Sequence, residues 1–327
     1  MFVCVLGDSS WGILPGLGRW KEGGEDASHL YTARGGEIFM GIFPSLENAP
    51  APEDLFPFLL ARGALLETGF PALLARSGSW KSPEVPFIEM GGTSPEHPLS
   101  LEGEKRRFSR ALQLGRELGK ITDRLVLGSC VPGGVLGSLL LLRGLGWEEE
   151  ELLSDVEEIT SQRDLLWNDY ASKTGIREGG LQGNPWEALL LSGDPSLSVL
   201  GGIAAGAPRS CGIFLGGDLS MLGVGAFLRA QKIRRPLGID LFPSRNETLR
   251  SQRERLAKNL QMGYREIAGG EFAGTWGTFR KDDAKDLMGM AGALRYAEDL
   301  GVSRETVLAR VLDLYGSLGE APRKKTV

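Results

Sequence analysis

Short apolar runs alternate with longer segments of helical periodicity along most of this chain. Within 101–120, for example, apolar side chains recur every three or four residues, which is the spacing of one helix face. We predict buried strands from the apolar runs at 2–6, 37–43, 71–75, 124–127, 211–215 and 236–242. We predict helices over 52–67, 101–120, 148–169, 185–191, 221–230 and 247–260, and a last helix capped by Ser303.

This alternation predicts a doubly wound α/β fold, in which helices cover both faces of a mostly parallel sheet. The 327 residues allow one large domain or two smaller ones. We predict a single α/β domain over 1–320, with a smaller helical lobe around 148–185 and a flexible tail at 321–327. In such a fold the glycine-rich loops gather at one edge of the sheet, where small molecules bind.

Composition and charge narrow the function classes. The net charge is −5 and no stretch is strongly basic, which argues against nucleic-acid binding. The three cysteines lie far apart in apolar or glycine-rich runs, as reduced thiols of a cytosolic protein do, and not as a disulfide framework or zinc site. No apolar run reaches membrane-spanning length, and the first residues do not form a signal peptide. We therefore expect a cytoplasmic protein with no metal site and no membrane contact.

The most distinctive segment is a glycine-rich turn, Gly-Ser-Cys-Val-Pro-Gly-Gly-Val-Leu-Gly at 128–137, between an apolar run and a helix-like segment. Backbone N–H groups at a helix N-terminus attract anions, and Gly133 and Gly134 would let a ligand approach the main chain closely. The turn is a candidate cradle for a phosphate or carboxylate. The alternative is a tight strand-to-helix connection without a ligand. The turn matches neither the Walker pattern nor Gly-x-Gly-x-x-Gly.

Polar side chains accompany this turn and a second unit of the same construction at Gly216 and Gly217. Asp8 follows the first strand and Asp218 follows the second glycine pair, so each is either an acceptor for a sugar hydroxyl or a helix N-cap. Trp80 and Lys81 follow the third strand, where they line the mouth of a pocket or form an ordered loop packed by the indole.

Six stretches between about residues 3 and 318 together resemble the archaeal-type branch of the nicotinate-nucleotide:dimethylbenzimidazole phosphoribosyltransferases. Each motif is short, and the specificity comes from six of them occurring in register. They are Val-Cys-Val-Leu-Gly-Asp-Ser at 3–9 with Ile-Leu-Pro-Gly at 13–16; Ser-Gly-Ser-Trp-Lys at 77–81 with Val-Pro-Phe-Ile-Glu-Met-Gly-Gly at 85–92; Leu-Val-Leu-Gly at 125–128 with Val-Pro-Gly-Gly at 131–134; Pro-Trp-Glu-Ala-Leu at 185–189 with Gly-Asp-Pro at 193–195; Leu-Gly-Gly-Asp at 215–218; and Lys-Asp-Leu-Met-Gly-Met-Ala-Gly-Ala-Leu at 285–294.

The resemblance implies a three-layer Rossmann-like fold, a homodimer, and transfer of the phosphoribosyl group of nicotinate mononucleotide to an aromatic base such as 5,6-dimethylbenzimidazole, for the lower ligand of cobalamin. The pyridinium is a good leaving group and the incoming imidazole must lose a proton, so the chemistry needs one carboxylate base. Backbone N–H groups and one lysine suffice for the phosphate. No pyrophosphate leaves, so neither magnesium nor another cofactor is expected.

The resemblance assigns the base to Asp286, where the family has a glutamate. The loops depart further: Ser129 stands where the family has an acidic residue, Val135 and Leu136 replace two threonines, and Asp218 replaces another. These changes fit a paralogue with a different base or nucleotide, and they equally fit lost catalysis with retained binding. The predicted phosphate- and ribose-binding residues are Gly128, Ser129, Gly133, Gly134, Gly216, Gly217 and Asp218, and the predicted pocket adds Asp8, Trp80, Lys81 and Gly289.

Two other chemistries have less support in the sequence. A nicotinamide-dependent oxidoreductase would share the alternating strands and glycine loops, but the chain lacks the dinucleotide fingerprint and its trailing acidic ribose contact. Cys130 has no histidine in its sequence context to activate the thiol, so we do not expect nucleophilic catalysis there.

Overall fold

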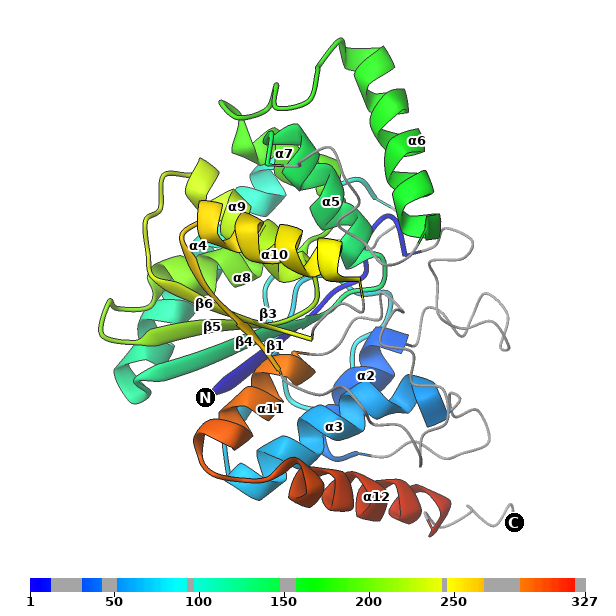
Figure 1. Ribbon diagram of the computed structural model, residues 1–327, viewed down its shortest axis with the longest axis vertical. Helices are drawn as coiled ribbons and strands as arrows, with labels where there is room; N and C mark the ends of the chain where they lie inside the picture. Colours follow the sequence, from blue (N-terminus) through cyan, green and yellow to red (C-terminus); the bar gives the residue numbers. More distant parts are fainter. Residues whose placement is uncertain are drawn as a thin grey trace.

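A computed structural model describes residues 1–12, 31–42, 52–92, 97–147, 157–242, 246–267 and 289–320 (Figure 1). In this part of the chain the strands form one sheet in the order β3-β2-β1-β4-β5-β6-β7, and every neighbouring pair is parallel. The strands are β1 (Phe2–Leu6), β2 (Ala72–Arg76), β3 (Ile88–Glu89), β4 (Arg124–Cys130), β5 (Gly212–Gly217), β6 (Leu237–Leu241) and β7 (Met262–Glu266). The predicted doubly wound α/β class is confirmed.

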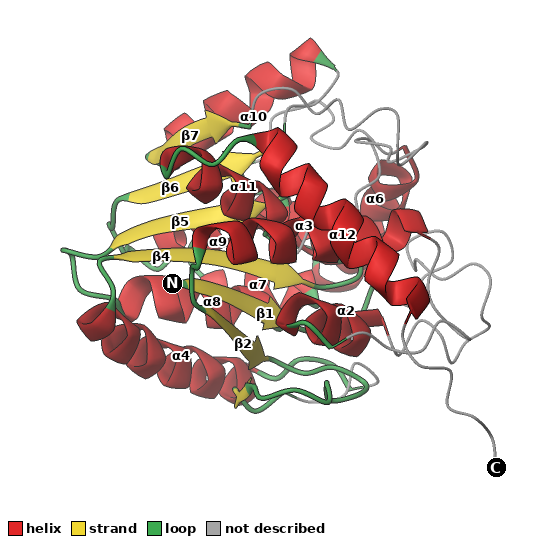
Figure 2. Cartoon of the chain, turned by 90° about the horizontal axis from the view of Figure 1, so that it is seen from below, coloured by secondary structure: helices red, strands yellow, loops and turns green. Residues whose placement is uncertain are grey.

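Helices cover both faces of the sheet, which gives three layers (Figures 1 and 2). The layer drawn below the sheet in Figure 1 contains α2 (Tyr31–Met40), α3 (Pro52–Thr68), α11 (Met290–Asp299) and α12 (Arg304–Glu320). The opposite layer contains α4 (Leu101–Ile121), α5 (Gly134–Gly144), α7 (Pro185–Ser192), α8 (Ser196–Gly206), α9 (Ser220–Ala230) and α10 (Glu247–Asn259).

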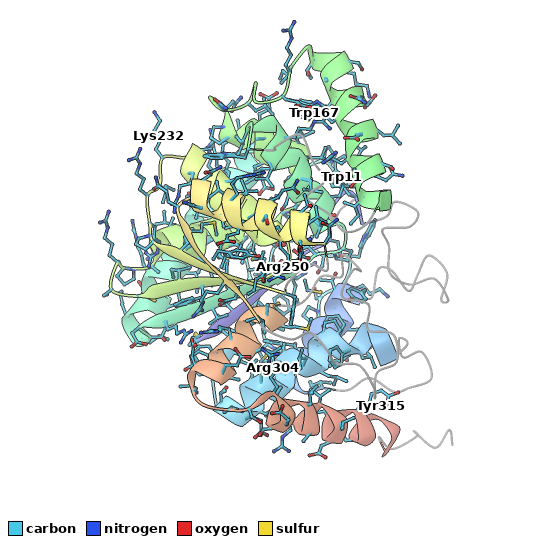
Figure 3. The ribbon with its side chains drawn as sticks, in the orientation of Figure 1. Trp11, Trp167, Lys232, Arg250, Arg304 and Tyr315 are labelled. Carbon is cyan, nitrogen blue, oxygen red and sulfur yellow. The ribbon has the colours of Figure 1, made fainter. Side chains whose placement is uncertain are left out.

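The helix α6 (Glu157–Thr174) lies on the outer side of α5, within the region predicted as a helical lobe. Arg143 of α5 contacts it twice: one guanidinium nitrogen donates to Asp164 Oδ1 at 2.6 Å, and the guanidinium carbon lies 5.4 Å from the ring centre of Trp167. The Trp167 side chain is labelled in Figure 3. This buried indole and the charged pair hold α6 at the periphery, away from the sheet.

Two hydrophobic cores fill the spaces between the layers, because successive side chains of a strand point to opposite faces. In β1, Val3 and Val5 belong to the core beneath α5, α8 and α9, whereas Phe2, Cys4 and Leu6 belong to the core beneath α2, α3 and α11. The central strands are therefore apolar on both faces, as expected of a covered parallel sheet.

Glycines let α11 approach the sheet at backbone distance. A Cβ atom on Gly216 would lie 2.5 Å from Gly292 Cα, and a Cβ atom on Gly289 would lie 2.8 Å from Gly128 Cα. Gly289 also has φ +69°, in the left-handed region that glycine adopts most readily. The start of α11 is thereby seated directly on β4 and β5.

Three local predictions need correction or addition. The predicted strand at 37–43 is wrong, because residues up to Met40 belong to α2, whose Ile38 and Phe39 pack into a core. A short apolar run does not distinguish a strand from a buried helix. Helix α8 and strand β7 were not predicted: the segment of α8 is rich in small residues, and the mostly polar strand β7 carries no apolar alternation.

Candidate functional site

The loops that follow β1, β2, β4 and β5 all leave the same edge of the sheet, since the strands are parallel. From β1 the chain builds the sheet outward in one direction through β2 and β3, and then returns to add β4 on the opposite side of β1. The direction in which strands are added to the sheet therefore reverses between β1 and β4. Such a reversal is where ligands bind in doubly wound sheets. The structure brings most of the predicted site residues to this edge: Asp8, Trp80, Lys81, Gly133, Gly134, Gly217 and Asp218.

A third segment meets the β1 and β4 loops at this reversal, namely the connection between α7 and α8. The backbone N–H of Ser10 donates to the carbonyl of Gly193 at 3.0 Å. The indole Nε1 of Trp11, labelled in Figure 3, donates to the carbonyl of Ser192 at 2.6 Å. Gly193 has φ +60°, and a Cβ there would lie 2.9 Å from Trp11 Nε1. No site residue was predicted in this connection, although it contains the Gly-Asp-Pro motif at 193–195.

Gly133 begins α5 in the left-handed conformation, with φ +76°. A Cβ atom on it would lie 2.7 Å from Ser9 Oγ and 2.9 Å from the backbone nitrogen of Gly12, so the β1 loop packs closely against it. The Ser9 hydroxyl also donates to the carbonyl of Pro132. Both the close packing and the left-handed backbone therefore require glycine at position 133. Because Gly133 is the N-cap residue of α5, that position offers no side chain to cap the helix.

Asp194 lies beside the first turn of α5 and is fully buried. Its Oδ1 accepts the backbone N–H of Ser196 at 2.7 Å, at the start of α8. Its Oδ2 lies 3.3 Å from the position that a Cβ on Gly134 would take, and has no hydrogen-bond partner in the described part of the chain. Burial, together with the negative charges of Glu104 and Asp218, raises the pKa of Asp194 to about 7, although the nearby hydroxyl and backbone N–H of Ser196 oppose the shift.

The loop after β5 carries a second carboxylate at this edge. Asp218 Oδ1 accepts the backbone N–H of Ser220 at 2.8 Å and its hydroxyl at 2.6 Å, so Asp218 caps the start of α9. Gly216 faces α11, and Gly217 has φ +158°. The first turn of α9 is thus capped by a carboxylate, whereas the N-cap residue of α5 is Gly133, which has no side chain, and the Asp194 carboxylate lies beside that turn with Oδ2 unpaired in the described residues.

Asp8, in the loop after β1, connects this loop to the loop after β2 and to helix α2. It is buried, its Oδ2 accepts the backbone N–H of Trp80 at 2.7 Å, and its Oδ1 accepts the hydroxyl of Thr32 in α2. The indole of Trp80 is half-buried and Lys81 is exposed. The Asp8 carboxylate consequently fixes the position of the β2 loop relative to the β1 loop.

The remaining predicted residues lie in different environments. Ser129 is buried within β4, paired with Val5 of β1, and Gly128 and Gly289 meet at the contact between β4 and α11. Asp286 lies outside the described residues. In the part of the chain that the structure describes, no group of three or more histidine, cysteine or acidic side chains could hold a metal ion, and no helix could cross a membrane. Cys4, Cys130 and Cys211 are buried, and none of them forms a disulfide bond in the described part of the chain.

Comparisons with known proteins agree with this architecture. No family model matches the chain. A UPF0284 protein from Pyrococcus furiosus is 27% identical over 341 residues, which cover 97% of this chain and 98% of that protein. A UPF0284 protein from Microcystis aeruginosa is 28% identical over 241 residues, which cover 70% of this chain but only 65% of that protein's length.

Among solved structures, CobT from Thermus thermophilus superposes with a TM-score of 0.53 at 14% identity, over 93% of this chain and 86% of that one. A second structure, of the nicotinate-nucleotide-dimethylbenzimidazole phosphoribosyltransferase from the same organism, gives the same TM-score and identity. At this identity the likeness establishes a shared fold. The chain is thus similar in sequence to UPF0284 proteins and shares its fold with CobT, the fold that the resemblance of its six motifs implies.

Proposed function

We propose that this protein transfers the phosphoribosyl group of nicotinate mononucleotide to an aromatic base such as 5,6-dimethylbenzimidazole. The observation that carries the proposal is the likeness of the fold to CobT over 93% of the chain, with the glycine loops after β4 and β5 at one edge of the sheet. The proposal includes a homodimer, which the sequence resemblance implies, and a cytoplasmic location, which the cysteine pattern favours.

The two glycine loops have different chemical roles in this proposal. The first turn of α5 binds the phosphate, because peptide N–H groups at a helix N-terminus favour an anion and no side chain caps this one. The first turn of α9 is already occupied, because the Asp218 carboxylate accepts the backbone N–H and the hydroxyl of Ser220. Asp218 therefore accepts a ribose hydroxyl, as carboxylates do in nucleotide sites.

Asp286 is the proposed general base that removes the proton from the incoming imidazole. It precedes Gly289 by three residues, and Gly289 lies against Gly128 of β4 and Gly216 of β5. An aspartate retains the charge of the family's glutamate but is one methylene shorter.

The test is a turnover assay that follows nicotinate release from nicotinate mononucleotide with a panel of benzimidazoles and purines. We expect release with at least one base, and we expect Asp286→Asn to abolish it while donor binding is retained. Asp283→Asn, a matched change in the same polar run, should leave the rate unchanged. Full-speed turnover by Asp286→Asn would exclude Asp286 as the base.

A second candidate function is a catalytically impaired paralogue that binds a nucleotide or base in a regulatory or salvage role. The observation in its favour is that Val135 and Leu136, at the family's two threonine positions, are buried apolar side chains of α5 and offer no hydroxyl. Measurable binding of nicotinate mononucleotide without nicotinate release, with any base in the panel, would favour this function.

A further inference from the structure

The Asp194 carboxyl group is a buried acid with one unused oxygen, placed between the first turns of two helices. Its Oδ1 is engaged by the Ser196 N–H of α8, and its Oδ2 faces the Gly134 side of α5 without a partner in the described residues. Asp194 Cβ also lies 3.4 Å from the position of a Cβ on Gly137, one helical turn further along α5. The acid is therefore held against the helix end proposed to bind phosphate.

Within the described residues, two acidic groups from neighbouring elements raise the pKa of Asp194. Glu104 reaches it from α4 and Asp218 from the loop after β5. Glu104 is itself engaged: it forms a buried ion pair with Arg107, and its Oε2 accepts the Ser198 hydroxyl at 2.5 Å. The guanidinium of Arg107 thus pairs with Glu104 and not with Asp194. The negative charge of Asp194 is stabilised by helix dipoles and by the Ser196 N–H.

A bound phosphate would place a second anion at the same helix end. Two negative charges a few ångströms apart in a water-poor environment repel strongly, so binding favours the neutral form of whichever group can take up a proton. Asp194 is that group, because its pKa of about 7 already lies close to neutrality.

We propose that Asp194 takes up one proton from solvent when a phosphomonoester binds at the first turn of α5, and so couples donor binding to pH. The proton is placed on Oδ2, while Oδ1 continues to accept the Ser196 N–H, and it returns to solvent when the phosphate leaves. Asp194 is a positioning residue in this scheme, since it is fully buried. The inference deepens the proposed function and rests on it for the identity of the anion.

The test measures the affinity for sulfate and for nicotinate mononucleotide between about pH 6 and about pH 8.5. Sulfate keeps a constant charge over this range, so any pH dependence must come from the protein. As the pH rises across this range, we expect the anion affinity of the unmodified protein to fall. The total fall is up to about tenfold for each unit by which the bound anion raises the Asp194 pKa. Asp194→Asn should bind with a nearly constant affinity close to that of the unmodified protein at low pH. Asp123→Asn, an exposed change at the opposite end of β4, should keep the full pH dependence.

Calorimetry of sulfate binding to the unmodified protein, at about pH 8 in two buffers of different ionisation enthalpy, gives the second readout. We expect a net uptake of a clear fraction of one proton, which approaches one if the anion raises the Asp194 pKa to about 9 or higher. An uptake near zero, or an unchanged pH dependence in Asp194→Asn, would overturn the inference even if the enzyme turns over. Proton-linked binding without turnover would support the inference and contradict the proposed function. If neither sulfate nor nicotinate mononucleotide binds, both the inference and the proposed function are wrong.

Discussion

Replacing Asp194 by asparagine should change the pH dependence of folding stability in a direction that the structure determines. The carboxyl group is fully buried, only one of its oxygens is hydrogen-bonded, and its pKa is raised to about 7, first by burial and then by Glu104 and Asp218. An asparagine keeps the size and the acceptor for Ser196 but carries no charge at any pH.

The magnitude follows from the two pKa values. An aspartate in the unfolded chain titrates near 3.9. Between about pH 4 and about pH 7 the folded state holds a proton that the unfolded state has lost, so the stability contributed by Asp194 falls as pH rises through this window. From pH 5 to pH 8 the loss amounts to about 2–3 kcal/mol, at about 1.4 kcal/mol per pKa unit. The new amide leaves a buried N–H without an acceptor, which costs about 1–3 kcal/mol at every pH.

The free energy of unfolding of Asp194→Asn, relative to the unmodified protein, should therefore improve by about 2–3 kcal/mol between pH 5 and pH 8. Urea denaturation at several pH values, followed by circular dichroism, measures this difference. The Asp123→Asn control should show no such trend, since that side chain is exposed. A constant offset between Asp194→Asn and the unmodified protein, or a gap that widens in favour of the aspartate at high pH, would refute the reasoning.

Two packing predictions can be checked by the same denaturation assay. Gly216→Ala should destabilise the fold by about 1–3 kcal/mol, because its Cβ would meet the α11 backbone at 2.5 Å, whereas Gly316→Ala, with nothing within 4 Å, should be neutral or slightly stabilising. Arg107→Met should cost about 3–5 kcal/mol, because it leaves Glu104 buried without its cation, whereas Arg106→Met removes an exposed ion pair and should have little effect. Equal losses within either pair would contradict the assigned contacts.

Much of the architecture was predictable because the spacing of apolar side chains in each helix or strand reflects which of its faces is buried. The strands β1, β2, β5 and β6 and the helices α3, α4, α7 and α10 lie close to their predicted ranges. Where a local pattern was ambiguous, packing decided. Residues up to Met40 became helical because a helix buries Ile38 and Phe39 against the sheet, which the apolar run alone does not specify.

The sequence also predicted that the glycine loops after β4 and β5 would meet at one edge, which follows from parallel strands. It did not predict what surrounds each loop. Gly133 is covered by the loop after β1 and Gly216 by α11, and both contacts join segments distant in sequence. For Asp218 the sequence left a sugar-hydroxyl acceptor and a helix N-cap open, and the structure shows its carboxylate capping α9.

By itself, the sequence determined the alternation of strands and helices, the parallel sheet and the shared edge of its loops, because these depend on local periodicity and on chain connectivity. Only the tertiary structure decided that Asp194 is buried between α5 and α8, and that Glu104 and Asp218 reach it from distant parts of the chain. Burial and neighbouring charge, which determine a pKa, arise from the folded assembly of segments and are absent from any one of them.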